Sequence, residues 1–273
     1  AITGQGKFYD KKLHSVRASD TDFDYSNIIN NSDIPIITHE DGQWATLPNF
    51  DVRKKYKGSL HPYYLDIYED FMRDRGTLNR YEDYYMASGK FQTLLYKSTW
   101  EAALRTPGYG GVQMLDLRDF PGQGYAPVGS FDEFWESKGY VTTEEYNKFC
   151  NVTTPLARFD SFVWESDQDL EAQVMISHYG PKDLEEKIVK WNLTDKKGKI
   201  IGKGSFGPID LPTGYVTTAG NIKEPLSSIT EASQVNLSVK LEGLDNENSW
   251  DMWVYPNEKP AEMKSNEIIV SQL

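Results

Sequence analysis

The sequence predicts a mixed fold, in which an α/β half is followed by an all-β half, with the change near Pro155. Two observations predict it. Before that point, amphipathic helical segments alternate with short apolar strands, which is the pattern of a parallel sheet covered by helices. After it, short segments of period-two alternation follow one another between turn signals. We therefore expect an α/β domain over 1–155 and an antiparallel β-sandwich of immunoglobulin-like size over 156–273.

The first half alternates strand and helix signals. The apolar stretch IPIIT at 34–38 predicts a strand buried on both faces. A helix ending at a C-cap glycine is expected over 60–76, because apolar residues recur there at helical spacing: Leu60, Tyr64, Ile67 and Phe71. An Asn-x-x-Glu start at 79–82 opens a long amphipathic helix, which TPGYGG stops near residue 105. VQMLDL predicts a second strand, and SFDE and TTEE are capping-box starts of two more helices, at 112–117, 130–133 and 142–145.

The second half predicts a run of strands. Five segments alternate with period two, at 171–180, 187–195, 199–206, 234–243 and 249–256. DKKG and EGLDNEN supply turns between them, and the stretch at 260–273 is either a last strand or a tail.

Composition excludes several classes of protein. A formal charge of −12 argues against nucleic acid as a partner, because phosphate backbones require clustered Lys and Arg. One cysteine and four scattered histidines predict no disulfide framework, no metal site and no cofactor. No apolar run reaches the roughly 20 residues of a membrane span, and AITGQGKFYD lacks the pattern of a signal peptide. The 13% aromatic content is typical of large aromatic cores or of sugar-stacking surfaces.

Both predicted strands of the first half end on acids, Glu40 in one case and Asp116 with Asp119 in the other. In a (β/α)8 barrel the functional groups lie at the carboxyl ends of the strands. A complete barrel takes about 250 residues, whereas only about 155 precede the sandwich. By length, the first half is either another α/β arrangement or the last part of a barrel.

The chain resembles the C-terminal portion of bacterial glycoside hydrolase family 2 type enzymes, particularly the polysaccharide-degrading group common in gut Bacteroidetes. The resemblance runs from about Thr21 to Pro256 and is carried by IPIITHEDGQWATLPNF, YKSTWEAALRTPGYGGVQMLDLRDFPGQG, FWESKGY, ISHYGPKDL and NSWDMWVYP. It implies that the first half forms the last two strand–helix units of a (β/α)8 barrel, with IPIITHE as strand seven and GGVQMLDLRDF as strand eight. It also implies a periplasmic or secreted protein.

The resemblance assigns Glu40 to the position of the catalytic nucleophile. The alternative is an acid at the end of a strand that pairs with an Arg or Lys side chain. His39 and Gln43 are expected to bind sugar hydroxyls or to orient Glu40. Trp44 is expected either to stack on a sugar or to pack in the interior.

Three further residues are expected to contact substrate at the end of strand eight: Asp116, Asp119 and Gln123. For the two aspartates the alternative is an ion pair with Arg118 or Arg105. No metal takes part in this site.

A retaining glycosidase needs a second carboxyl group about 5–5.5 Å from the nucleophile. The family's acid/base glutamate ends strand four, and no segment before residue 34 matches it. We therefore expect a fragment of a hydrolase acting on oligosaccharides from plant or host polysaccharides, inactive alone. The alternatives are a non-catalytic carbohydrate-binding or interaction module, and a standalone protein that uses the α/β half as a scaffold.

A partial barrel leaves sheet edges that proteins rarely expose. We expect self-association, the missing N-terminal part of the barrel, or a rearrangement of the first 30 residues to cover this edge.

Overall fold

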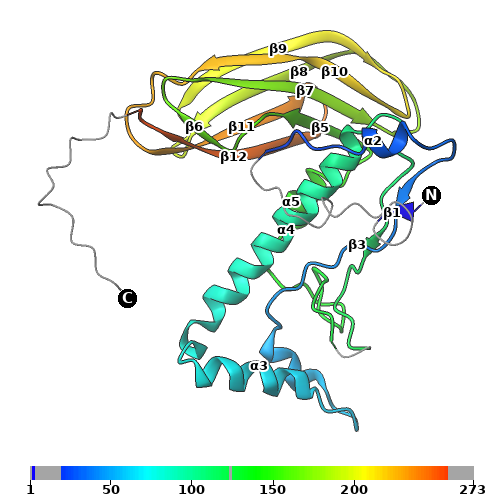
Figure 1. Cartoon of the computed structure of the whole chain (residues 1–273), viewed down its shortest axis with the longest axis vertical. Helices are drawn as coiled ribbons and strands as arrows, with labels where there is room; N and C mark the ends of the chain where they lie inside the picture. Colours follow the sequence, from blue (N-terminus) through cyan, green and yellow to red (C-terminus); the bar gives the residue numbers. More distant parts are fainter. Residues whose placement is uncertain (1, 4–19, 123–124, 258–273) are drawn as a thin grey trace, which may run out of the picture.

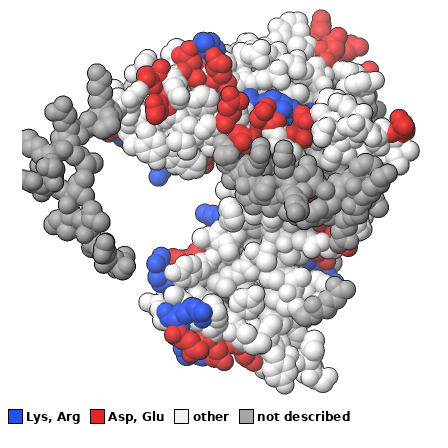
Figure 2. Space-filling view, viewed as in Figure 1, with Lys and Arg blue, Asp and Glu red and all other residues white. Residues whose placement is uncertain are grey.

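The computed structural model describes residues 2–3, 20–122 and 125–257. A long helix, α4 (Tyr81–Arg105), runs from a helical and looped part to a β-sandwich (Figure 1). The molecule is hollowed between these two parts (Figure 2). None of the described helices is long and apolar enough to cross a membrane.

The sandwich consists of a three-stranded and a five-stranded sheet that share one core. The first sheet has the order β10 (Tyr215–Pro225), β7 (Asp169–His178), β5 (Thr153–Arg158). The second has the order β6 (Val163–Glu165), β12 (Glu247–Tyr255), β11 (Ser233–Leu241), β8 (Leu184–Asp195), β9 (Ile200–Leu211). Side chains from both sheets are fully buried between them, among them Val174, Leu193 and Leu237.

All five strands expected from the alternation are present. Four of them, β7, β8, β11 and β12, bury alternate side chains in this core, whereas β9 contributes mainly partly buried side chains such as Phe206. Strands β5, β6 and β10 were not expected. The sandwich is not wholly antiparallel, since β6 pairs in parallel with β12. The chain passes from β5 in one sheet to β6 at the edge of the other, and this crossing fixes the direction in which β6 enters.

In the described part of the first half, four short strands form two parallel pairs. β1 (Ile2–Thr3) pairs with β2 (Ile37–Thr38), and β3 (Asp41–Gly42) pairs with β4 (Met114–Leu115). An isolated parallel bridge joins Ile37 to Gly111. The structure is therefore a mixed α/β arrangement beside a sandwich. Because β1 lies against β2, residues from the N-terminal segment do cover this strand edge.

The stretch 34–38 is buried on one face only, so the expectation of burial on both faces is wrong. Ile36 and Thr38 are 0% and 3% exposed, whereas Ile37, which lies between them, is 41% exposed. The buried face packs on a cluster that includes Tyr25 and the end of α4.

Helix α3 (Tyr63–Asp74) ends as expected, because Gly76 adopts a φ of +66°. Its expected apolar stripe, however, faces outward, with Ile67 68% and Phe71 53% exposed. A 3-10 turn, η2 (Leu78–Arg80), precedes α4, so Asn79 does not cap this helix. The other short helices are α2 (Ser26–Ile29), η1 (Phe50–Lys55) and α5 (Thr143–Asn147).

Of the two expected capping boxes, one is confirmed and one is wrong. Thr142 and Glu145 form the capping box that begins α5. SFDE at 130–133 begins no helix, because the Asp132 carboxylate accepts hydrogen bonds from the backbone N–H groups of Phe134 and Glu136 and folds a turn instead.

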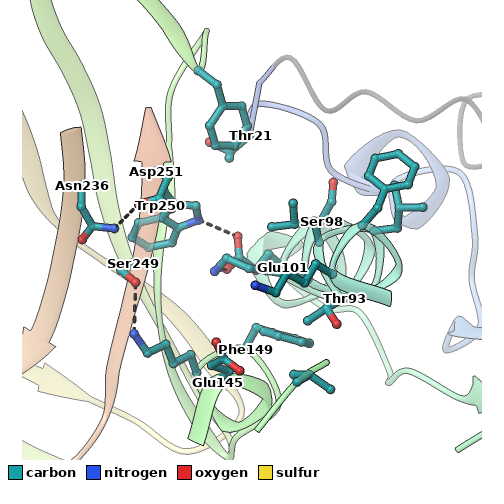
Figure 3. A pocket seen from close by; sticks show the side chains of 18 of the residues that line it. Thr21, Thr93, Ser98, Glu101, Glu145, Phe149, Asn236, Ser249, Trp250 and Asp251 are labelled. Carbon is teal, nitrogen blue, oxygen red and sulfur yellow. Dashed lines mark hydrogen bonds and ion pairs between the residues drawn. The ribbon is translucent and has the colours of Figure 1, made fainter. Parts of the chain in front are cut away.

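Helix α4 is fixed to the sandwich by Glu101, which is 1% exposed (Figure 3). Its carboxylate accepts hydrogen bonds from Trp250 Nε1 at 2.9 Å and Asn248 Nδ2 at 2.7 Å, both on β12. It also pairs with Lys97 and lies 3.7 Å from Arg105 Nη1. The four-residue spacing of Lys97, Glu101 and Arg105 predicts these ion pairs within α4. The hydrogen bonds of Glu101 to Trp250 and Asn248 connect the helix to the sandwich.

Candidate active site

Glu40 lies between β2 and β3, where the chain runs parallel to the strand at 111–115. Its side chain is 33% exposed. Its φ of +53° is in the left-handed region, which residues other than glycine rarely occupy. Such a backbone is kept where the surroundings enforce it, frequently at functional sites. Here β3 and β4 fix the chain immediately after Glu40.

Two neighbours contact the Glu40 carboxylate. Gln43 Nε2 donates a hydrogen bond to Oε2 at 3.1 Å, and His39 Nε2 lies 3.7 Å from Oε1. His39 Nδ1 lies 2.9 Å from Gln113 Oε1. Because an amide oxygen only accepts, this contact is a hydrogen bond when Nδ1 carries the ring proton. The structure thus brings together His39, Glu40 and Gln43, as their spacing suggested.

Gln113 was missed by the sequence analysis. The signal lies in the register of the two segments, since the parallel bridge between Ile37 and Gly111 places Gln113 opposite His39, two residues further on. Aligning the two acid-ending strands side by side would have placed Gln113 next to His39.

Asp41 is a second missed residue. Burial raises the pKa of its carboxyl from 3.8 to about 7, against the opposing effect of the Gly42 N–H. Its Oδ2 is buried and has no hydrogen-bond partner among the described residues. Gly42, with a φ of +105°, lies so close to α4 that a Cβ would come within 2.1 Å of Tyr96 Cε1. This close approach of β3 to α4 keeps water away from Asp41.

Trp44 packs against the cluster of Tyr96, Trp100 and Phe149. Its backbone carbonyl accepts a hydrogen bond from Gln92 Nε2. This packing favours the interior role over sugar stacking.

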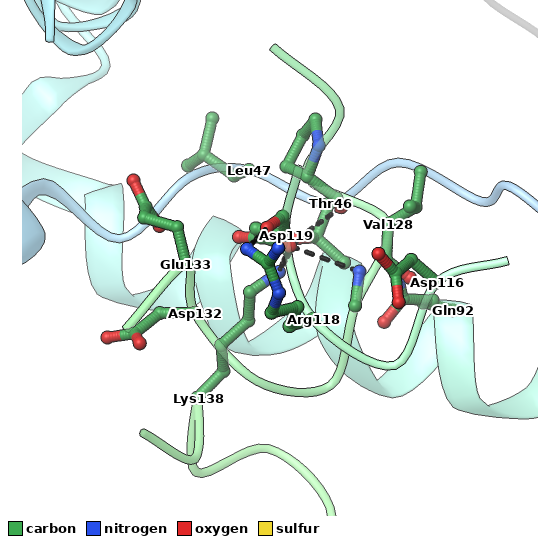
Figure 4. Close-up of polar contacts among 12 residues, drawn as sticks. Thr46, Leu47, Gln92, Asp116, Arg118, Asp119, Val128, Asp132, Glu133 and Lys138 are labelled. Atoms are coloured by element: carbon green, nitrogen blue, oxygen red, sulfur yellow. Dashed lines mark hydrogen bonds and ion pairs between the residues drawn. The ribbon is translucent and has the colours of Figure 1, made fainter. Parts of the chain in front are cut away.

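Asp119 forms an ion pair in the interior, with Lys138 rather than with Arg118 or Arg105 (Figure 4). Lys138 Nζ lies 2.5 Å from Oδ1, and the two side chains are 0% and 1% exposed. Tyr125 and the Gly129 N–H donate further hydrogen bonds at 3.0 Å. Burial raises the pKa of Asp119 to about 6, although Lys138 acts in the opposite direction. No oxygen is left accessible to a substrate, so we assign Asp119 to the support of this loop.

Asp116 and Gln123 are the remaining two candidates. Asp116 is half-buried, and its Oδ1 accepts a hydrogen bond from the Leu117 N–H at 2.6 Å. Gln123 lies outside the described residues.

The segments that follow β3 and β4 pack on each other beyond Glu40. Lys55 pairs with Asp132 and, at 2.9 Å, with Glu136. The Tyr64 and Tyr125 rings stack with centroids 3.7 Å apart. These contacts build one continuous wall from two segments that are distant in sequence. Within the described ranges, no group of three or more His, Cys, Asp or Glu side chains is arranged to hold a metal ion.

Comparison with known sequences gives one match. Residues 168–256, which contain β7 to β12, match a domain family described as a domain of unknown function, DUF8488. No curated protein matches the chain in sequence.

Solved structures with similar parts include glycoside hydrolases. The exo-chitosanase CsxA of Amycolatopsis orientalis matches 86% of this chain and 26% of its own, with a TM-score of 0.43 and 11% identity. A putative beta-galactosidase of Bacteroides fragilis matches 33% of this chain and 14% of its own, with a TM-score of 0.26 and 13% identity. The CARDB domain of a Pyrococcus furiosus protein matches 38% of this chain and 94% of its own, with a TM-score of 0.31 and 10% identity. These TM-scores are low, so the similarity assigns no activity to this chain.

Proposed function

We propose that this chain carries the nucleophile side of a retaining glycoside hydrolase site, with Glu40 as the nucleophile. The observation that supports it is the placement of Glu40 at the end of a strand with a parallel neighbour, accessible to solvent and contacted by His39 and Gln43. In this reaction the Glu40 carboxylate attacks the anomeric carbon and forms a glycosyl ester, while the bond to the leaving-group oxygen breaks. Gln43 orients the attacking carboxylate, and His39 is available to bind a sugar hydroxyl.

The proposal includes a finer architecture, in which the strands at 37–42 and 111–115 are the last two of a (β/α)8 barrel. Their parallel register supports it, as does the order strand, helices α3 and α4, strand. Glu40 and Asp116 then both follow barrel strands, where barrel enzymes place their reactive groups.

The general acid of the proposed site comes from a segment outside the described residues or from a partner chain. A substrate with a poor leaving group, such as a natural oligosaccharide, needs that acid to protonate the departing oxygen. A 2,4-dinitrophenyl glycoside does not, because dinitrophenolate is a stable anion. The chain that carries the nucleophile should therefore react with such a reagent on its own. Because we propose that the protein is periplasmic or secreted, the assay uses buffer conditions of the periplasm or the extracellular medium.

The test measures dinitrophenolate release from four 2,4-dinitrophenyl β-glycosides, whose sugars are glucose, galactose, mannose and glucuronic acid. We expect a burst proportional to the protein concentration with one of these sugars. Glu40→Gln should abolish the burst. Glu242→Gln, which removes a carboxylate from an exposed ion pair with Lys190 on the sandwich, should leave it unchanged. An unchanged burst in Glu40→Gln, or no release from the unmodified chain with any sugar, would contradict the proposal.

A further inference from the structure

A cleft of about 570 Å³ lies between α4 and the outer face of the five-stranded sheet, with α5 at one end (Figure 3). Pockets that hold small ligands have volumes of about 300–1,000 Å³. None of Glu40, His39, Gln43 and Gln113 lines this cleft, so it is separate from the candidate active site.

One wall of the cleft is aromatic and belongs to β12. Trp253 is 43% exposed, and Trp250 lies at the base, where its N–H is already donated to Glu101. Because side chains alternate along a strand, Tyr255 continues the exposed face on which Trp253 lies, and it is 48% exposed. Both rings are thus exposed on this face of β12, although Tyr255 lies beyond the residues that line the cleft. Across the cleft, α4 contributes Phe91 and Leu94, which are 52% and 60% exposed.

Polar groups lie beside this aromatic surface. On the neighbouring strand, Asn236 Nδ2 donates to Asp251 Oδ1 at 2.7 Å, and the two residues are direct cross-strand partners. Lys148 of the segment after α5 donates to Ser249 Oγ at 3.2 Å. Amide, carboxylate, hydroxyl and ammonium groups thus line the same cleft as the Trp253 ring. Each retains donors or acceptors beyond the bond it makes here.

The charges of the cleft balance. Four cationic side chains line it, Lys90, Lys97, Arg105 and Lys148, and four anionic ones, Asp20, Glu101, Glu145 and Asp251. A phosphate or carboxylate ligand needs a net positive lining, and a polyamine needs a net negative one. The balance therefore favours a neutral ligand that presents both an apolar face and many hydroxyl groups.

We propose that this cleft binds a neutral oligosaccharide, with one sugar ring stacked on Trp253 and its hydroxyls bonded to Asn236, Asp251 and Lys148. The C–H face of a pyranose matches an indole ring, and equatorial hydroxyls project sideways toward polar groups at the ring edge. Tyr255 lies where a second sugar unit would continue along β12. The proposed site binds the oligosaccharide without catalysing a reaction on it. This proposal does not depend on the role of Glu40 as a nucleophile.

The experiment titrates the whole chain with cellohexaose, mannohexaose, xylohexaose and β-1,4-galactotetraose, and with polygalacturonate oligomers as anionic probes. Binding is followed by isothermal calorimetry and by tryptophan fluorescence. We expect at least one neutral probe to bind and the anionic probes not to bind. Trp253→Ala should weaken that binding about tenfold or more, and Asp251→Ala should weaken it by a smaller factor.

Three controls separate the outcomes. Tyr215→Ala removes a similarly exposed ring from β10 on the other sheet and should leave binding unchanged. Glu40→Gln should also leave it unchanged, so that failure of this proposal and failure of the proposed catalysis remain distinguishable. Circular dichroism and the melting temperature show that each variant is folded. Binding that is insensitive to Trp253→Ala, binding of anionic probes only, or no binding of any neutral probe at millimolar concentration would overturn the proposal.

Discussion

Replacing Glu101 by alanine should remove the main link between α4 and the sandwich. Glu101 is 1% exposed and its two oxygens serve Lys97, Arg105, Asn248 and Trp250. Removing one partner of a buried ion pair destabilises a protein by about 3–5 kcal/mol, because the remaining charge is left buried. Each unpaired buried N–H group adds about 1–3 kcal/mol, although groups that share one carboxylate do not add fully.

We therefore expect Glu101→Ala to lower the free energy of unfolding by about 4 kcal/mol, out of the roughly 5–15 kcal/mol typical of a domain. Urea unfolding measures it, followed both by far-ultraviolet circular dichroism and by tryptophan fluorescence. The matched control is Glu242→Ala, which removes a half-exposed ion pair with Lys190 and should change stability by less than about 1 kcal/mol. A loss below about 1 kcal/mol in Glu101→Ala would refute the assignment of this link.

Three other substitutions test local features, each by urea unfolding. Asp41 holds its proton more tightly in the folded protein, so the free energy of unfolding should fall as pH rises from about 4 to about 7. Asp41→Asn should remove this trend and raise the free energy of unfolding by up to about 4 kcal/mol at pH 8. An undiminished pH trend in the variant would count against the buried carboxyl. Lys138→Met leaves the Asp119 carboxylate buried without its cation, so it should lower the free energy of unfolding by about 3–5 kcal/mol. An unchanged free energy of unfolding would show that the pair is open to solvent. Gly89→Ala places a Cβ 2.1 Å from the Tyr140 ring. It should lower the free energy of unfolding by about 1–3 kcal/mol, despite the better helix propensity of alanine. A stabilised variant would contradict this packing.

The parts of the fold that follow from local chemistry could be predicted from the sequence. The alternation at 187–195 and 234–243 predicts strands because each buries one face in a shared core. TPGYGG after Arg105 ends α4 as its Pro and Gly content requires. The Thr142–Glu145 pair caps α5 through two hydrogen bonds between residues that are only three apart in the sequence.

The errors arise where a side chain has a second option that the sequence does not reveal. SFDE has the pattern of a capping box, but Asp132 folds a turn and also pairs with Lys55, which is 77 residues away in the sequence. The stretch 34–38 is apolar enough for burial on both faces, yet only the face toward Tyr25 is covered.

The candidate site could be predicted only in part. Glu40, His39 and Gln43 are local in sequence, so their spacing brings them together. Gln113 reaches His39 through strand pairing, which depends on register. Asp119 looked like a substrate ligand because its partner Lys138 lies across a loop whose fold the sequence does not specify.

The most direct measurement of the central claim identifies the residue that a trapped sugar modifies. The chain is incubated with 2,4-dinitrophenyl 2-deoxy-2-fluoro β-glycosides, whose fluorine slows hydrolysis of the glycosyl ester, and is then digested and analysed by mass spectrometry. The proposed mechanism predicts one fluoroglycosyl group on the peptide that contains IPIITHEDGQW, located by fragmentation at Glu40 and absent from Glu40→Gln. Labelling at another carboxylate, or an unlabelled chain with every sugar of the series, would contradict the assignment of Glu40 as the nucleophile.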